Sequence, residues 1–232
     1  MQRKIITTKD GSKTIQIEEW NEQYHSVHGA IQEANHVFIK HGLLFCYSEF
    51  FSQTKNEISI LEIGFGTGLN ALITLLEAEK LKLKINYTGV EAYPVLQKEI
   101  EQLNYAEELN ADNSIFLEMH NAQWETQREI TENFILNKQQ KFFKDITETN
   151  TYNLIYFDAF GARVQPDLWT EVIFKAMYKA LKNKGVLVTY SAKGSVRRAM
   201  QAVGFIVERL PGPPGKREML RATKYGNQHS TI

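Results

Sequence analysis

The chain has 232 residues and a mass of 26.7 kDa, with 43% hydrophobic residues, 23% charged residues and a formal net charge of zero. This length suits one domain, or one domain with a small attachment, and the composition is typical of a folded globular protein. No apolar run reaches the roughly 18 to 20 residues of a membrane span, and the first residues lack the apolar centre of a signal peptide. We therefore expect a cytosolic protein without a membrane segment.

Cysteine and histidine usage argues against disulfide and metal chemistry. Cys46 is the only cysteine, so no internal disulfide can form, and no Cys/His cluster has the spacing of zinc ligands. His25 and His28 lie close in sequence, but a structural or surface role is favoured over metal binding. We expect no bound metal.

The first 52 residues are predicted to form an extension that packs on a main domain over residues 53–232. The stretch "KIITTKDGSKTIQI" has two β-rich runs around Asp10-Gly11, which is typical of a hairpin. Residues 19–51 look helical and aromatic, without clear element boundaries. The extension is therefore predicted to be a small β-hairpin followed by helical segments.

The main domain alternates apolar strands with helical stretches. Strands are predicted over residues 58–63, 85–90, 141–144, 152–157 and 186–190. Between them we place a helix over 69–81, one that begins at Pro94, a long segment over 115–137, one that begins at Pro166 and one that begins near Ser195. This alternation predicts an α/β fold with a doubly wound parallel sheet. The stretch "GFIVERLPGPPGKREMLRATK" adds a terminal antiparallel hairpin.

A glycine turn follows the first strand of this sheet. In "LEIGFGTGLN", Gly64, Gly66 and Gly68 lie where such sheets bind ligands, and glycine lets the backbone come close to a ligand. The nicotinamide fingerprint needs a glycine where this chain has Leu69, and the phosphate-binding G-x-x-x-x-G-K-[ST] motif is absent. These spacings favour an adenosine cofactor that has a cationic centre and no phosphate.

Four carboxylates accompany the glycine turn at predicted strand ends. Glu91 follows the second strand, where an acid can accept both ribose hydroxyls, and Asp145 ends the predicted third strand, near the place of an adenine amino group. Asp158 ends the fourth strand, and Glu62 precedes the glycines, where it could meet an ammonium group or brace the turn. Four acids would repel a pyrophosphate and suit a sulfonium with an amino-acid tail, so S-adenosylmethionine fits best.

The end of the fourth strand points to the acceptor. In "FDAFGA" an acid, Asp158, and an aromatic residue, Phe160, face the predicted methyl donor. An aromatic ring can stack on a planar group while a carboxylate accepts a hydrogen from an amine, which suits methyl transfer to nitrogen. Asp158 could orient the amine or remove its proton. Phe160 could instead belong to the core.

Charge is unevenly distributed along the chain. Residues 99–132 contain nine acidic residues and one basic residue, whereas residues 175–224 contain twelve basic and two acidic residues. Such a separation indicates either a polyanion bound on one face or ordinary solvated helix faces.

Four motifs together resemble a known family. "GFGTGLN", "DAFGARVQPDLWTEVIF", "SVRRAMQAVGF" and "GKREML" resemble the methyltransferase half of the tRNA 5-methylaminomethyl-2-thiouridine biosynthesis proteins, the MnmC type. The resemblance implies a class I, Rossmann-like methyltransferase that uses S-adenosylmethionine to methylate the 5-aminomethyl group of wobble uridine in tRNA. The resemblance implies that the cofactor is surrounded by Glu62, Gly64, Gly66, Gly68, Glu91, Asp145 and Asp158. Thr67, in the glycine turn, and Asn70, at the start of the following helix, complete the set of candidate cofactor-binding residues.

The resemblance also implies how the substrate binds. A tRNA anticodon loop would lie over the basic C-terminal third, with Lys216 and Arg217 near the phosphates. Tyr24, Phe160 and Trp169 are candidates for stacking on bases, although Trp169 could equally be a core residue.

This chain differs from the family pattern in ways that leave other functions open. Well-known members carry a flavin-dependent oxidase domain, for which this chain is too short, so a separate enzyme would have to supply the aminomethyl form of the uridine. The third-strand motif is short and aromatic ("KFFKDI"), and "GARV" stands where a proline is common. Two alternatives are a methyltransferase or aminopropyltransferase that acts on a free small amine, and a binding module that has lost catalysis.

Overall fold

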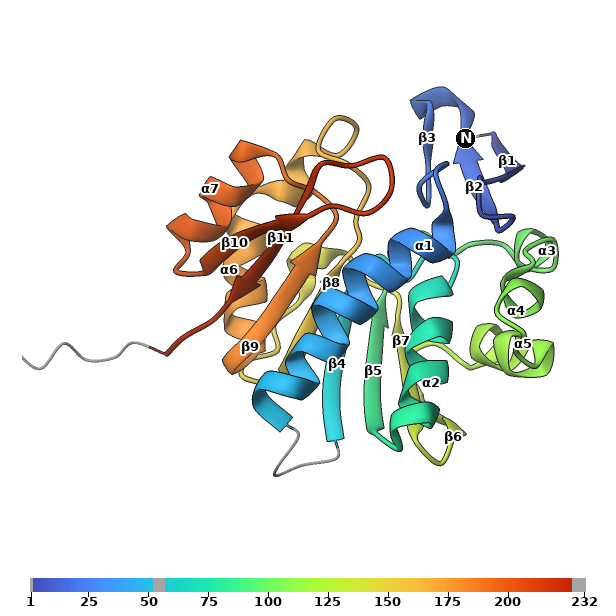
Figure 1. Ribbon diagram of the computed structural model, residues 1–232, viewed down its shortest axis with the longest axis horizontal. Helices are drawn as coiled ribbons and strands as arrows, with labels where there is room; N and C mark the ends of the chain where they lie inside the picture. The colour runs from blue at the N-terminus through green and yellow to red at the C-terminus, as the bar shows by residue number, and fades with distance from the viewer. Residues whose placement is uncertain (1, 52–56, 227–232) are drawn as a thin grey trace, which may run out of the picture.

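The computed structural model describes residues 2–51 and 57–226, which form two sheets with helices around them (Figure 1). The small N-terminal sheet contains Arg3–Thr7 (β1), Lys13–Ile17 (β2) and Glu22–Gln23 (β3). Strands β1 and β2 pair antiparallel, which confirms the predicted hairpin, and β3 pairs antiparallel with β2.

The large sheet contains eight strands. They are Glu57–Ile63 (β4), Lys84–Val90 (β5), Gln127–Thr131 (β6), Phe134–Gln139 (β7), Tyr152–Phe157 (β8), Leu181–Thr189 (β9), Ile206–Pro211 (β10) and Glu218–Thr223 (β11). Their order is β10-β11-β9-β8-β4-β5-β7-β6. The five middle strands are parallel, and β6, β11 and β10 add antiparallel edges. The predicted doubly wound sheet with a terminal antiparallel hairpin is confirmed.

Helices cover both faces of the large sheet. The α-helices are Ala30–Ala34 (α1), Leu69–Leu81 (α2), Gln97–Ile100 (α3), Tyr105–Glu108 (α4), Asn113–Asn121 (α5), Glu171–Ala180 (α6) and Gly194–Ala202 (α7). Short 3₁₀ helices span Glu18–Trp20 (η1), Phe143–Asp145 (η4) and Pro166–Trp169 (η5), and π-helices span Asn35–Leu44 (η2) and Tyr47–Phe51 (η3). No helix among the described residues is both long and apolar enough to cross a membrane.

The predicted third strand is wrong. Residues 141–144 do not form a strand, because the chain there turns into η4, and the third parallel strand is β7 instead. The long segment over 115–137 also breaks up: only its beginning belongs to α5, and the rest forms β6 and β7 around a tight turn at Glu132 and Asn133. Strand β7 carries Asn137, Lys138 and Gln139, so polar residues concealed its character.

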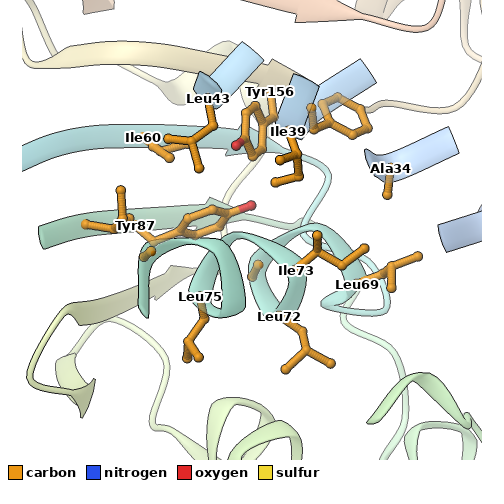
Figure 2. Close-up of a cluster of buried hydrophobic side chains, with 14 of the residues drawn as sticks. Ala34, Ile39, Leu43, Ile60, Leu69, Leu72, Ile73, Leu75, Tyr87 and Tyr156 are labelled. Carbon is orange, nitrogen blue, oxygen red and sulfur yellow. The ribbon is translucent and has the colours of Figure 1, made fainter. Parts of the chain in front are cut away.

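The core has two halves, one on each face of the large sheet. Along β4 the side chains alternate, as a strand requires. Ile58 and Ile60 pack in the half that contains α1, η2 and α2, whereas Leu61 and Ile63 pack in the half that contains α6 and α7. Figure 2 shows the first half, where side chains from η2 and α2 meet Ile60.

The order of the strands indicates the end of the sheet at which a ligand would bind, the mouth of the sheet. Strands β5 and β7 lie on one side of β4, and β8 and β9 lie on the other, so the strand order reverses beside β4. Ligands bind at the carboxyl ends of the strands at such a reversal. The N-terminal sheet and the turn between β10 and β11 lie at this same end (Figure 1). The predicted boundary between residues 52 and 53 lies outside the described residues.

Candidate active site

The glycine turn joins β4 to α2 at the mouth of the sheet. Gly64, Gly66 and Gly68 have φ angles of +90°, +50° and +74°, which side chains rarely adopt. A Cβ atom on Gly64 would lie 2.7 Å from the carbonyl oxygen of Asp158, and one on Gly66 would lie 3.1 Å from the Tyr24 ring. Glycine is therefore required because the turn passes close to the end of β8 and to the N-terminal extension.

Two predicted acids are connected through Asn70. Its Nδ2 donates to Glu62 Oε1 and to Asp158 Oδ2, both at 2.8 Å. Glu62 is 1% exposed, and its second carboxylate oxygen has no hydrogen-bond partner among the described residues. Of the two roles predicted for Glu62, this burial favours bracing: Glu62 holds Asn70, and Asn70 orients Asp158 at the mouth.

Burial makes the Asp158 carboxyl group unusually basic. Desolvation, followed by the negative charge of Glu33, raises the pKa of Asp158 to about 7, while the hydrogen bond from Asn70 and the charge of Lys216 act in the opposite direction. Burial also raises the pKa of Glu62 well above its usual range. Asp158 can therefore gain or lose a proton near neutral pH.

Glu91 lies beside the turn, as predicted. Its carboxylate oxygens accept hydrogen bonds from the backbone N–H groups of Gly66, at 3.2 Å, and Tyr93, at 2.9 Å. The carboxylate is thus fixed in place, with acceptor positions left over for hydroxyl groups. Nearby, the exposed rings of Tyr93 and Phe142 lie 6.1 Å apart between centroids. This aromatic pair was not predicted, although each of its rings follows soon after a strand of the parallel sheet.

Asp145 does not end a strand as predicted. It belongs to η4 rather than to the end of a strand, and its side chain is exposed. Its placement was wrong because it depended on the wrong third strand, while its contact with the cofactor stays a prediction. No hydrogen bond between the Asp145 carboxylate and another predicted site residue is present among the described residues.

Thr67, at the centre of the turn, is held by three residues from other elements. Its hydroxyl group lies 2.7 Å from His25 Nε2 and accepts a hydrogen bond from the Tyr105 hydroxyl at 3.1 Å, while its carbonyl oxygen lies 3.1 Å from His120 Nε2. Burial lowers the pKa of His25 to about 4, so this ring is neutral at pH 7. The structural role expected for His25 fits these contacts. Among the described residues, no three potential metal ligands cluster.

Aromatic residues line the side of the mouth next to Asp158. The rings of Tyr24 and Phe160 lie 4.9 Å apart, and Trp20 packs on Phe160 at 5.5 Å. Trp169 is buried, and its Nε1 donates a hydrogen bond to the Phe160 carbonyl oxygen at 2.8 Å. Of its two predicted roles, this position agrees with the core role rather than with base stacking. The Tyr190 hydroxyl group donates to the Ala159 carbonyl oxygen at 2.8 Å. Both bonds fix the loop that follows Asp158.

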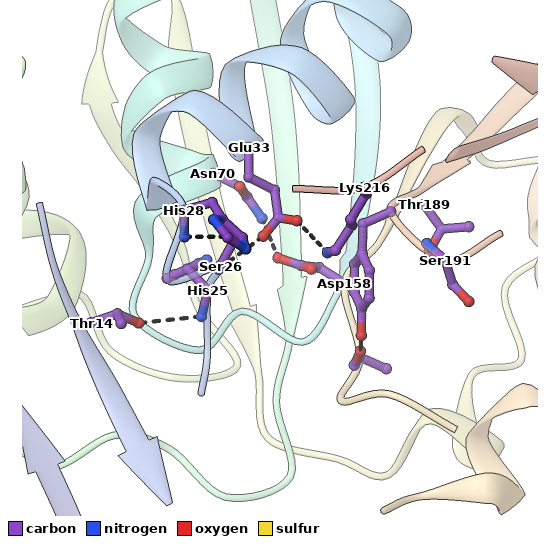
Figure 3. A network of polar contacts seen from close by, with 12 residues as sticks. Thr14, His25, Ser26, His28, Glu33, Asn70, Asp158, Thr189, Ser191 and Lys216 are labelled. Carbon is purple, nitrogen blue, oxygen red and sulfur yellow. Dashed lines mark hydrogen bonds and ion pairs between the residues drawn. The ribbon is translucent and has the colours of Figure 1, made fainter. Parts of the chain in front are cut away.

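The two predicted phosphate-binding residues differ in their surroundings. The ammonium group of Lys216 pairs with Glu33 of α1 and lies 3.9 Å from the centroid of the Tyr190 ring. Figure 3 shows this pair next to Asp158 and Asn70. Arg217, by contrast, is exposed. Glu33 and Tyr190 were not predicted as site residues, because both contact Lys216, which is distant from them in sequence.

The site therefore combines a glycine turn, fixed carboxylates and an aromatic mouth. A model of a protein family described as S-adenosyl-L-methionine-dependent methyltransferase matches residues 101–225. The chain belongs to this methyltransferase family. The predicted activity class and the predicted cofactor, S-adenosylmethionine, are confirmed by this match.

Individual relatives agree with the resemblance seen in the motifs. The chain is 27% identical to the tRNA 5-methylaminomethyl-2-thiouridine biosynthesis bifunctional protein MnmC of Hydrogenovibrio crunogenus, over 86% of this chain and 31% of that protein. It thus spans about a third of the length of the curated relatives it matches. The predicted resemblance to MnmC-type methyltransferases is confirmed.

Solved structures support the same fold. A crystal structure of MnmC2 from Aquifex aeolicus superposes with a TM-score of 0.74 at 25% identity, over 95% of this chain and 70% of that chain. Spermidine synthase from Thermotoga maritima has a TM-score of 0.59 at 14% identity, over 97% of this chain and 69% of that chain. The second likeness concerns the fold alone.

Proposed function

We propose that this methyltransferase acts on the amine of the 5-aminomethyl group of wobble uridine, with or without 2-thiolation, in tRNA. The support is of two kinds. The relatives described above are tRNA 5-methylaminomethyl-2-thiouridine biosynthesis proteins. In addition, the site contains Asp158, whose pKa is about 7, next to the paired rings of Tyr24 and Phe160. The observation that carries the proposal is Asp158, held by Asn70 at the end of β8.

We assign the cofactor to the mouth of the sheet beside β4. The carboxylate of Glu91 would accept hydrogen bonds from the ribose hydroxyls, and the backbone of residues 64–68, held in shape by the contacts of Thr67, would lie beneath the cofactor. Asn70 and Glu62 keep Asp158 oriented towards the cofactor. When bound, S-adenosylmethionine supplies a methyl group on a positively charged sulfur. Acidic side chains around the site suit that charge.

Asp158 prepares the acceptor. A primary amine is largely protonated at neutral pH and has no free electron pair in that form. Asp158, as the carboxylate, takes one proton from the ammonium group, which leaves a neutral amine and a carboxylic acid, and the acid later returns the proton to water. Positioning and exclusion of water then supply most of the acceleration.

The remaining proposed contacts hold the RNA. Tyr24 and Phe160 form a ring pair on which a flipped base can stack, and exposed Arg217 is available to a backbone phosphate. Because the reaction consumes an exposed amine, an earlier activity, which we propose resides in a separate enzyme, has to produce that amine.

Nucleoside mass spectrometry of tRNA from cells with and without the gene tests the proposal. We expect 5-aminomethyl uridine to accumulate and its N-methylated form to disappear when the gene is removed. An unchanged profile would refute the tRNA substrate. Turnover of S-adenosylmethionine with a free small amine and no RNA would favour the alternative acceptor instead.

A further inference from the structure

Lys216 lies inside the mouth rather than on the outer surface. It belongs to the turn between β10 and β11, yet its ammonium group pairs with Glu33 Oε1 and its side chain is only 31% exposed. The ammonium group also lies over the Tyr190 ring, 3.9 Å from the centroid, a distance typical of a strong cation–π contact. A cation is thus held by one carboxylate and one aromatic face.

The groups that hold this cation are themselves fixed. Glu33 uses its second oxygen to accept a hydrogen bond from the Ser26 backbone N–H at 3.0 Å, and its side chain is 9% exposed. The Tyr190 ring is anchored by its hydroxyl group on the Ala159 carbonyl oxygen. Neither group has to rearrange in order to hold an ammonium ion, so the site is preorganised for one.

Asp158 belongs to the same electrostatic environment. The charges of Glu33 and Lys216 both act on its pKa, the first raising it and the second lowering it. In Figure 3 the Asp158 carboxylate lies beside the Glu33–Lys216 pair and is held there by Asn70. Two carboxylates and one ring therefore interact with the primary alkylammonium group of Lys216.

The aminomethyl group proposed as acceptor, in its protonated form, is also a primary alkylammonium group. We propose that Glu33, Tyr190 and Asp158 form the binding site for the ammonium group of the acceptor, and that Lys216 occupies this site until the acceptor displaces it. This inference rests on the proposed amine acceptor and adds to it the residues that recognise the amine. Lysine suits the role because its flexible stem lets the ammonium group leave without movement of the backbone.

Self-occupancy has a measurable consequence. When a ligand has to displace an internal competitor, its apparent Kd equals the intrinsic Kd divided by the fraction of molecules whose site is empty. Replacement of Lys216 by methionine keeps the stem and removes the competing charge. For tRNA that carries 5-aminomethyl uridine, we expect the KM of Lys216→Met to fall about three- to tenfold, while the Kd of the same tRNA without the modification stays unchanged.

Glu33→Gln provides the opposite test. Glutamine can still accept the Ser26 hydrogen bond, but it carries no charge, so we expect the KM for modified tRNA to rise about tenfold with an unchanged Kd for S-adenosylmethionine. Lys80→Met is the matched control, because Lys80 pairs with Glu77 at 3.1 Å near the far end of α2. Thermal unfolding of all three variants identifies any general loss of structure.

Other outcomes would overturn the inference. If Lys216→Met weakens modified and unmodified tRNA equally, Lys216 contacts phosphate and does not occupy an amine site. An unchanged KM also overturns it. If the wild-type enzyme methylates no tRNA, the proposed function fails separately, and calorimetry with benzylamine then decides the amine site: tighter binding to Lys216→Met than to the wild type supports it, and absence of binding refutes it.

Discussion

Asp158 is the residue whose protonation sets the pH range of the proposed reaction. It can accept a proton only as the carboxylate, and burial places its pKa at about 7. The groups that act on its pKa are Glu33 from α1, Asn70 from α2 and Lys216 from the turn between β10 and β11. As the pH falls below about 7, the carboxylate is lost, so we expect kcat/KM to decrease about tenfold per pH unit.

Replacement of Asp158 tests this role directly. Asp158→Asn keeps a hydrogen-bond acceptor but cannot take a proton, so we expect kcat/KM to fall by about 100-fold or more at pH 8 and the acidic limb near 7 to disappear. Asp167→Asn, on the exposed side of η5, is the control and should retain both. Full activity of Asp158→Asn at high pH would leave Asp158 only an orienting role.

At the scale of elements, Thr67 joins the N-terminal extension to the turn between β4 and α2. Its hydroxyl group forms hydrogen bonds with both His25 and Tyr105, which are buried. Thr67→Val keeps the shape and leaves both partners without this bond, so we expect the free energy of unfolding to fall by about 1–3 kcal/mol in denaturant titrations without cofactor.

The matched control for this prediction is Thr149→Val. Thr149 is exposed, in the loop before β8, and its replacement should change the free energy of unfolding by less than about 0.5 kcal/mol. Equal effects of the two substitutions would show that the contacts of Thr67 do not stabilise the junction.

The elements with simple patterns could be predicted from sequence. Strand β4 has four large aliphatic residues among its seven, and a glycine turn follows it directly. Helix α2 begins directly after a glycine and keeps its apolar residues through Leu81, so its bounds were predicted correctly. Strand β7 could not be found in this way, because it contains Lys138, which is 1% exposed. The Lys138 ammonium group is accommodated by the Trp124 ring, 4.9 Å away, and by a hydrogen bond to the His120 carbonyl oxygen. Only the folded chain brings those partners together.

The same distinction applies to the candidate site. The glycines, Glu91 and Asp158 follow strands directly, so their place at the mouth could be inferred from the order of elements alone. Glu33 comes from α1, which continues into the π-helix η2, an irregular segment without a clear periodic pattern. Tyr190 directly follows β9, but its role depends on a lysine 26 residues further along, which no local pattern reveals.

At the scale of the whole molecule, the charge asymmetry of the sequence becomes a difference between the two edges of the sheet. Residues 99–132 supply α4, α5 and β6 at one edge, and residues 175–224 supply α7, β10 and β11 at the other (Figure 1). Part of the basic excess is neutralised locally, because Arg221 pairs with Glu208 and Arg209 with Glu218. Arg198 and Arg217 remain exposed on the basic edge.

This distribution predicts from which side tRNA approaches. If the anticodon loop lies over the basic edge, charge reversal in Arg217→Glu removes one phosphate contact and adds a repulsive charge. We expect the Kd for tRNA to rise about five- to tenfold, and the slope of log Kd against log salt to decrease by about one. The Kd for S-adenosylmethionine should stay unchanged, since Arg217 lies outside the glycine turn and its acids.

Arg128→Glu separates the position of the charge from the total charge. Arg128 lies on β6 at the acidic edge, its side chain is 61% exposed, and it pairs with Glu118 at 2.9 Å. The substitution changes the net charge by the same amount as Arg217→Glu, so any effect of overall charge appears equally in both variants. We expect filter-binding titrations to show a weak effect for Arg128→Glu and a strong one for Arg217→Glu. This difference is expected because a docked polyanion interacts most strongly with charges within about one Debye length. Similar losses in the two variants would instead mean that tRNA is attracted by the net charge and that the basic edge has no special role.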